Sequence, residues 1–171
     1  MLSSTQTSTV LEYDFLVIGY GSELCGDDAV GPWVAMVVAD WHLPAVKSLS
    51  VPQLTPELTT ELAKTNYVMF VDACGRKAVR TVQIAPIAVS DELSPSMAFA
   101  AHTYDPCALL NLTQRLYKRH PQAWLMQIPI ESCDLGGELS SVARQGCDRA
   151  LRSIEQFLVT YRQPALCMKS V

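Results

Sequence analysis

Three side chains in this sequence have the types and positions needed for metal or acid–base chemistry. Asp28 is the second of two adjacent aspartates that follow the glycine-containing stretch VIGYGSELCG (17–26). Asp72 lies near the end of the apolar run YVMFVDA (67–73), where aspartate is disfavoured in a strand. His102 lies just before a predicted helix start. Two carboxylates and a neutral imidazole suit a borderline divalent metal with positions left open for substrate or water. Acid–base hydrolysis by the two aspartates is the rival chemistry.

Each of these residues also has a structural explanation. One aspartate of the pair can cap the following helix, because a carboxylate accepts free N–H groups and suits the helix dipole, but this leaves the other unexplained. Asp72 can form a turn ahead of Gly75. His42 and His120 fall at predicted helix ends, where an imidazolium is favourable. His102 precedes a helix N-terminus, where a neutral imidazole, the form that binds metals, is favoured.

A nucleotide site is the other reading of the glycine turn. The segment GYG (19–21) begins a GxGxxG pattern, but the third glycine would fall at Leu24, and no phosphate-binding lysine follows. A dinucleotide-binding enzyme is therefore a less favoured alternative.

Composition limits the classes of partner. The chain has 171 residues, 49% of them apolar, and 13 basic against 17 acidic side chains give a net charge of −4. Without a basic tract, nucleic acid is not an expected partner. No secretory signal or long apolar run stands out, so we expect a cytoplasmic protein that does not enter a membrane. The six cysteines form no CxxC pair, which disfavours zinc and dithiol sites.

Strands and helices alternate along the chain. Strands are predicted over 13–19, 46–52, 67–73, 80–87 and 123–130, and helices within 29–42, 55–65, 105–120 and 138–162. Thr55 and Asp105 are predicted N-caps, because each precedes a proline at the first helical position. We expect a flexible segment over 1–12, one α/β domain over 13–162 and a tail over 163–171.

This alternation predicts a three-layer α/β fold with a mostly parallel, twisted five-stranded sheet and helices on both faces. Ligands of such sheets bind beyond the carboxyl ends of the strands. The loops after strands one, three and four contain Asp28, Asp72 and His102. The three side chains are therefore expected to converge at one end of the sheet.

The segment GYGSELCGDDAVGP (19–32) resembles the GxGNxLxxDDGxG motif of hydrogenase maturation proteases, the endopeptidases that trim the large subunit of nickel-iron hydrogenases. FVDAC (70–74), AH (101–102) and IPIESCDLGGELS (128–140) follow in the family's order, and the similarity covers roughly 13–160. Ser22 replaces the usual asparagine and Ala29 the commoner glycine.

The resemblance implies a phosphorylase/hydrolase-like α/β fold and a nickel-dependent or aspartic-type endopeptidase. It places the metal-contacting and catalytic residues at Asp28, Asp72 and His102. The implied cofactor is nickel that arrives in the precursor of the large subunit, and zinc or cadmium could take its place in crystals. Whether the metal polarises the scissile carbonyl or only docks the substrate is left open.

We expect the protein to be a monomer, although no feature of the sequence specifies the oligomeric state. The segment PQLTPEL (52–58) resembles the corresponding segment in the branch of the family that serves bidirectional, NAD-coupled hydrogenases. A metal-binding chaperone that uses the same three ligands without cutting is the main alternative.

Overall fold

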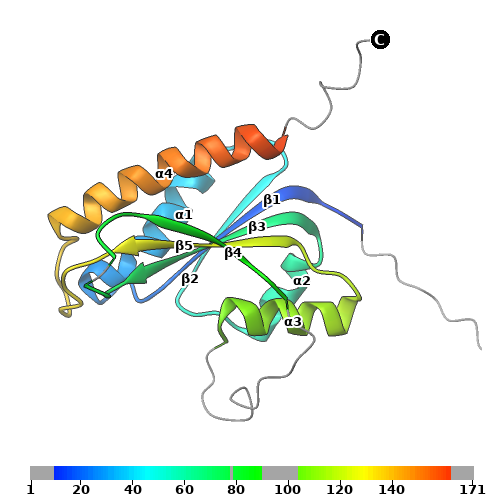
Figure 1. Cartoon of the computed structure of the whole chain (residues 1–171), viewed down its shortest axis with the longest axis horizontal. Coiled ribbons are helices and arrows are strands. Elements are labelled where there is room, and N and C mark those ends of the chain that lie inside the picture. The colour runs from blue at the N-terminus through cyan, green and yellow to red at the C-terminus, as the bar shows by residue number, and fades with distance from the viewer. Residues whose placement is uncertain (1–9, 78, 90–103, 163–171) are drawn as a thin grey trace, which may run out of the picture.

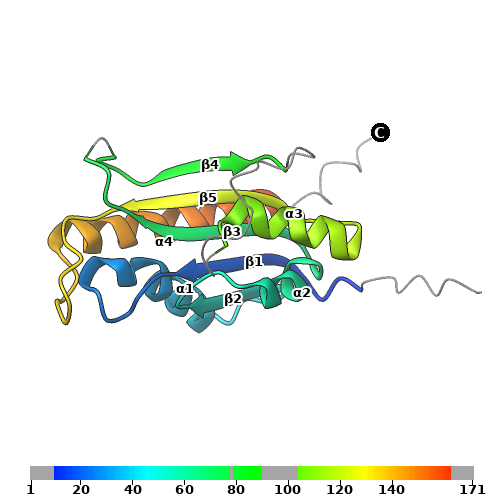
Figure 2. The same cartoon turned by 90° about the horizontal axis from the view of Figure 1, so that it is seen from below.

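A single five-stranded sheet forms the centre of the computed structural model, which describes residues 10–77, 79–89 and 104–162. Four strands run parallel: β1 (Tyr13–Tyr20), β2 (Val46–Val51), β3 (Thr65–Cys74) and β5 (Gln122–Pro129). The fifth, β4 (Gln83–Ile87), lies antiparallel beside β5. The order across the sheet is β2-β1-β3-β5-β4, which Figure 2 shows as strands one above another.

Helices cover both faces of this sheet. On one face lie α1 (Val30–Asp40) and α4 (Ser141–Arg162); on the other lie α3 (Pro106–Tyr117) and the short α2 (Thr59–Leu62) (Figure 1). Short 3₁₀ turns, η1 (Gly26–Ala29) and η2 (Pro56–Leu58), lead into α1 and α2. The predicted three-layer architecture is confirmed.

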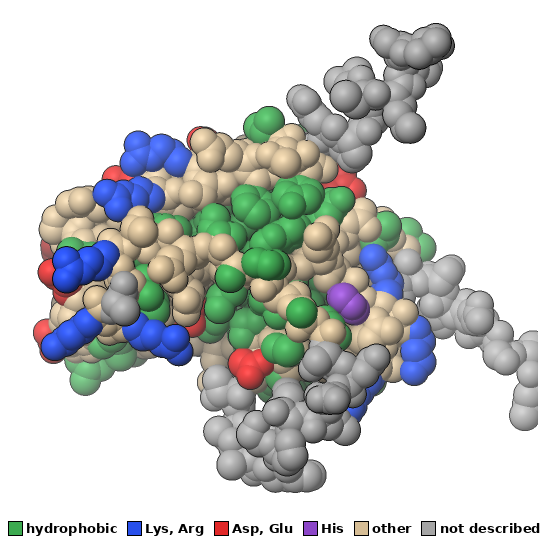
Figure 3. Space-filling view, viewed as in Figure 1, with side chains coloured by type: hydrophobic (Ala, Val, Ile, Leu, Met, Phe, Trp, Pro, Cys, Tyr) green, Lys and Arg blue, Asp and Glu red, His purple; other side chains and the backbone are tan. Residues whose placement is uncertain are grey.

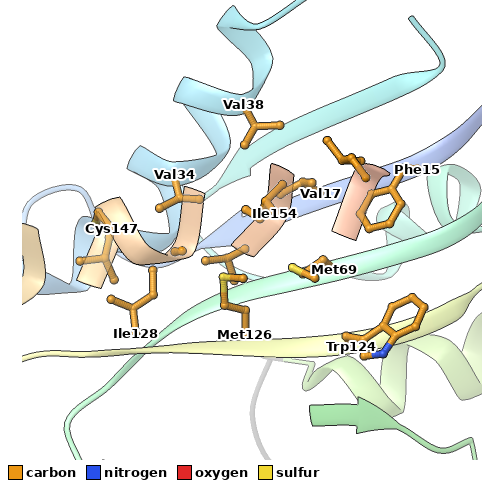
Figure 4. Close-up of a cluster of buried hydrophobic side chains, with 14 of the residues drawn as sticks. Phe15, Val17, Val34, Val38, Met69, Trp124, Met126, Ile128, Cys147 and Ile154 are labelled. Atoms are coloured by element: carbon orange, nitrogen blue, oxygen red, sulfur yellow. The ribbon is translucent and has the colours of Figure 1, made fainter. Parts of the chain in front are cut away.

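Each face of the sheet has its own apolar core because successive side chains of a strand point to opposite sides. Phe15 and Val17 of β1 pack with α1 and α4 in the first cluster, and Leu16 and Ile18 pack with α2 and α3 in the second. Figure 4 shows the first cluster. Burial on both faces explains why β1 and β3 read as nearly continuous apolar runs.

Aromatic side chains close the first core at the carboxyl-terminal part of α4. The ring of Trp124 on β5 lies 5.0 Å, centroid to centroid, from the rings of both Phe157 and Tyr161. In the view of Figure 3, which is that of Figure 1, apolar side chains gather in the middle of the surface, below α4. The end of the long helix is therefore attached to the sheet by ring contacts.

Of the two predicted N-caps, one is confirmed. Asp105 Oδ1 accepts the N–H of Ala108 at 2.7 Å and caps α3. Thr55 makes no side-chain cap; its hydroxyl instead interacts with the carboxylate of Glu57 and lowers the pKa of that group.

The direction of β4 changes one expectation. The sequence placed the loop after this strand with the loops at the carboxyl ends of the others, but Ile87 pairs with Ala123 near the start of β5. The carboxyl end of β4 therefore points toward the amino ends of the parallel strands, because the strand returns antiparallel. His102 lies outside the described residues, and its position stays a prediction.

In the part of the chain that the structure describes, no helix has both the length and the apolar character that crossing a bilayer requires.

Candidate functional site

The glycines of the first loop allow the backbone to pack closely around Asp28. Gly21 has φ +144°, and a Cβ on it would lie 2.2 Å from the carbonyl oxygen of Asp28. A Cβ on Gly31 would lie 2.5 Å from the carbonyl oxygens of Tyr20 and Val71. Only glycine fits at these contacts. The glycines thus bring the start of α1 against the ends of β1 and β3, with no phosphate needed to explain them.

Asp28 lies in η1, directly beyond the carboxyl end of β1. Its Oδ2 accepts the backbone N–H of Ser22 at 2.7 Å, which fixes the carboxylate against the glycine turn. The hydroxyl of Ser22 accepts the N–H of Leu24 at 3.3 Å. The side chain of Asp28 is half-buried, so part of it remains exposed at the carboxyl end of the sheet.

Asp72 lies next to Tyr20 across the two central strands. Gly19 pairs with Val71, so Tyr20 and Asp72 occupy the next facing positions, and their side chains share the α2/α3 face with those of Ile18 and Phe70 two residues earlier. The hydroxyl of Tyr20 hydrogen-bonds the carboxylate of Asp72. β1 and β3 are neighbours in the sheet, but the chain continues from β1 to β2 on one side and from β3 to β4 on the other. Open α/β sheets bind ligands where the connections diverge in this way, beyond the carboxyl ends of the strands.

Burial and charge change the protonation behaviour of this pair. Burial raises the pKa of the Asp72 carboxyl above its ordinary value of 3.8, and the nearby charge of Asp28 raises it further, against the hydrogen bonds from Tyr20 and the Ala73 N–H. Burial, followed by the charge of Asp72, also raises the pKa of Tyr20 far above its ordinary value. Tyr20 therefore stays a hydroxyl donor.

Replacing Tyr20 with phenylalanine is expected to raise the pKa of Asp72 further. The hydroxyl stabilises the ionised carboxylate, so its loss disfavours the charged form while the burial of Asp72 remains. The pKa is measured by following the carboxyl ¹³C chemical shift of Asp72 with pH. An unchanged or lower pKa in Tyr20→Phe would contradict the assigned hydrogen bond.

Asp27, next to Asp28, has a different role. It is 1% exposed, and its carboxylate accepts the N–H groups of Glu131 at 2.9 Å, Ser132 at 3.2 Å and Ser140 at 2.6 Å. The hydroxyl of Ser140 donates to it at 2.7 Å and accepts the N–H of Ala143 at 3.1 Å. Asp27 thus joins the first loop to the start of α4.

This corrects the sequence-based explanation of one aspartate as a cap of the following helix. Neither aspartate caps α1, which has no side-chain cap at its start. Burial alone would raise the pKa of Asp27, but the hydrogen bonds from Ser140, Glu131 and Ser132 outweigh it and hold the pKa below 3.8. Asp27 is a structural carboxylate, and Asp28 is left for another purpose.

Cysteines also lie near the two aspartates. Cys25 forms an isolated bridge with Leu135, which places Cys133 beside the first loop. Burial, and then the charges of Asp28 and Asp27, raise the pKa of the Cys133 thiol. The thiol is protonated at neutral pH, which argues against a nucleophilic role for Cys133. Cys74 is buried at the end of β3.

The structure brings together two of the three residues singled out in the sequence. Asp28 and Asp72 lie close enough for the charge of one to shift the pKa of the other. His102 is not among the described residues, and within those residues no three His, Cys, Asp or Glu side chains form a group that could hold a metal ion. Sequence reasoning missed Tyr20, whose only signal was a polar-tipped side chain between two glycines at a strand end.

No model of a known protein family matches the sequence, and no protein of curated function matches it. Solved structures do match. The [NiFe] hydrogenase maturation protease HycI from Thermococcus kodakarensis KOD1 is 22% identical, with 85% of this chain and 92% of that chain covered and a TM-score of 0.67. The hydrogenase maturating endopeptidase HybD from E. coli is 19% identical, over 86% and 93% of the chains, with a TM-score of 0.68.

A third match is the [NiFe] hydrogenase maturation protease HybD from Thermococcus kodakarensis, 19% identical over 84% of this chain and 98% of that chain, with a TM-score of 0.65. All three cover nearly the whole described domain and share its layered α/β architecture. The chain therefore has the fold of the hydrogenase maturation endopeptidases.

Proposed function

We propose that this protein is an endopeptidase that removes the C-terminal extension of a nickel-iron hydrogenase large-subunit precursor after nickel has been inserted. The observation that carries the proposal is the proximity of Asp28 and Asp72 at the carboxyl ends of β1 and β3. It occurs in a chain that shares the fold of hydrogenase maturation endopeptidases. Nickel in the precursor is part of the substrate, and Asp28, Asp72 and His102 are its proposed contacts on the protease.

The chemistry of these side chains suits such a substrate. Carboxylate oxygens and an imidazole nitrogen bind borderline divalent metals. Three ligands leave coordination positions for donors from the precursor itself. Asp28 and Asp72 lie at the carboxyl end of the two central strands and are only half-buried, so both remain partly exposed to a metal held by another protein.

The pKa of Asp72 also supports a role in metal contact at this end of the sheet. The ionised form of Asp72 is disfavoured by burial and by the charge of Asp28. A cation placed between the two carboxylates would relieve this repulsion and lower the pKa of Asp72. The site is therefore better suited to two carboxylates with a metal than to two carboxylates alone.

The test is trimming of the precursor, followed by mass spectrometry of the large subunit. The full-length protein is expected to shorten the nickel-loaded precursor and to leave the nickel-free precursor uncut, because the metal completes the contact between substrate and protease. The variant His102→Ala is expected to stay folded and to lose trimming. Equal cutting of both precursors would overturn the role of nickel, and no cutting of either would overturn the protease assignment and favour a chaperone.

Residues 52–58, which follow β2, indicate the type of hydrogenase that supplies the precursor. Their sequence resembles that of the family branch that serves NAD-coupled hydrogenases. We propose that the precursor belongs to a hydrogenase of this type and that the protease acts as a monomer. Trimming assays with precursors of different hydrogenase types, together with sedimentation of the protease, test both statements.

A further inference from the structure

A groove at the end of β2 adjoins the candidate site. It has a volume of about 350 Å³ and lies between the turn after β1 and the end of β2. Ser22, Glu23 and Leu24 line one side, and Ser50, Val51 and Pro52 line the other. Ser22, which lines the groove, donates its N–H to Asp28 Oδ2 at 2.7 Å, so the groove lies beside the loop that holds Asp28.

The backbone along one side of the groove is available for pairing. β2 is an edge strand, and the carbonyl of Val51 accepts the N–H of Gly21, so the polar groups of Val51 point toward β1. The groups of Ser50, one residue earlier, therefore point away from the sheet. Ser50 is exposed, and among the described residues no strand lies on this outer side. An unpaired edge of this kind can add an extended peptide as a further strand.

Side chains in the groove restrict what that peptide can be. Leu24 is 74% exposed, and with Val51 and Pro52 it offers an apolar surface. Among the described residues that line the groove, Glu23 alone is charged, and the carboxylate of Asp28 is bound to the N–H of the neighbouring Ser22. These carboxylates disfavour an acidic segment, so the fitting ligand is apolar or basic.

We propose that this groove binds an extended, non-acidic segment of the substrate polypeptide, which pairs with the outward N–H and C=O of Ser50 and packs an apolar side chain against Leu24. The peptide then extends across the carboxyl end of the sheet toward Asp28, so that the bond to be cut lies beside this carboxylate. This assignment rests on the proposed function, because it takes the precursor as the substrate.

The test compares Ser50→Pro with Ser50→Ala in the full-length protein. Proline removes the outward N–H but fits an edge strand, because this N–H is not used within the sheet, whereas alanine keeps it. For trimming of the nickel-loaded precursor, Ser50→Pro is expected to raise KM about 5- to 10-fold with little change in kcat. Ser50→Ala is expected to match the wild type. Equal KM values for both variants would overturn the proposal.

A second pair of variants covers the case in which Ser50→Pro does not fold. Leu24→Asp adds a charge in the groove and is expected to raise KM, whereas Leu116→Asp, at an exposed leucine on the last turn of α3, is expected to leave KM unchanged. Wild-type KM in Leu24→Asp would overturn the proposal.

Direct binding separates this assignment from the proposed function. A fluorescent peptide with the sequence of the precursor's C-terminal segment is titrated with each protein, and anisotropy is measured. Binding that Ser50→Pro weakens supports the groove even if the wild type cuts no precursor. Unweakened binding would overturn it even if the wild type cuts. A dimer that only Ser50→Pro dissociates, with unchanged peptide binding, would assign the groove to a second copy of the chain and also overturn the proposal.

Discussion

Replacing Asp72 with asparagine is expected to abolish trimming of the precursor and, at the same time, to raise the melting temperature of the protein. Trimming should fall by about 10²- to 10⁴-fold, the range for loss of a group that acts directly on the reaction. Stability should rise because burial and the charge of Asp28 hold the pKa of Asp72 above its ordinary value of 3.8. The ionised carboxylate therefore opposes folding at neutral pH, and a neutral amide removes this cost.

The pH dependence gives this prediction a second readout. In the wild type the cost is fully present above the raised pKa of Asp72 and disappears as the pH falls below it, whereas Asp72→Asn has no such term. Thermal unfolding as a function of pH and precursor trimming are measured on both proteins. Asp40→Asn, at an exposed position at the end of α1, is the matched control and should change neither quantity. If Asp72→Asn is less stable than the wild type at neutral pH, the ionised carboxylate of Asp72 does not destabilise the fold, and this assignment is wrong.

The opposite result is expected for the corresponding change at Asp27. Asp27→Asn should lower the free energy of unfolding by about 2 to 3 kcal/mol, because an amide nitrogen would face backbone N–H groups that now donate to a carboxylate. For a domain of this size the melting temperature should fall by roughly 5 to 10 °C. Any loss of trimming should follow from the loss of folded protein alone.

Acid titration checks the cause. The hydrogen bonds hold the pKa of Asp27 below 3.8 in the folded state, so its contribution is fully present above that value and is lost as the pH falls below it. Urea unfolding at several pH values should show this loss in the wild type and a flatter acid limb in Asp27→Asn. Equal stability of the two proteins at neutral pH would contradict the anchoring role of Asp27.

Local sequence determined much of the fold. The apolar runs of β1, β3 and β5 and the Asp105–Pro106 start of α3 all formed where the sequence predicted them. These features depend on burial, backbone geometry and capping within a few residues, so they can be read without the rest of the chain. The positions of Asp28 shortly after β1 and of Asp72 near the end of β3 were predictable for the same reason.

Only the tertiary structure decided which of the two adjacent aspartates is structural and which belongs to the candidate site. Asp27 and Asp28 have the same side chain and adjacent positions, yet Asp27 is committed to Ser140, 113 residues away, and Asp28 to Ser22 in its own loop. The partnership of Tyr20 with Asp72 likewise depends on the register of two parallel strands, and the direction of β4 on its pairing with β5. A carboxylate takes its role from the hydrogen-bond donors and charges around it, and here those groups come from segments that only folding brings together.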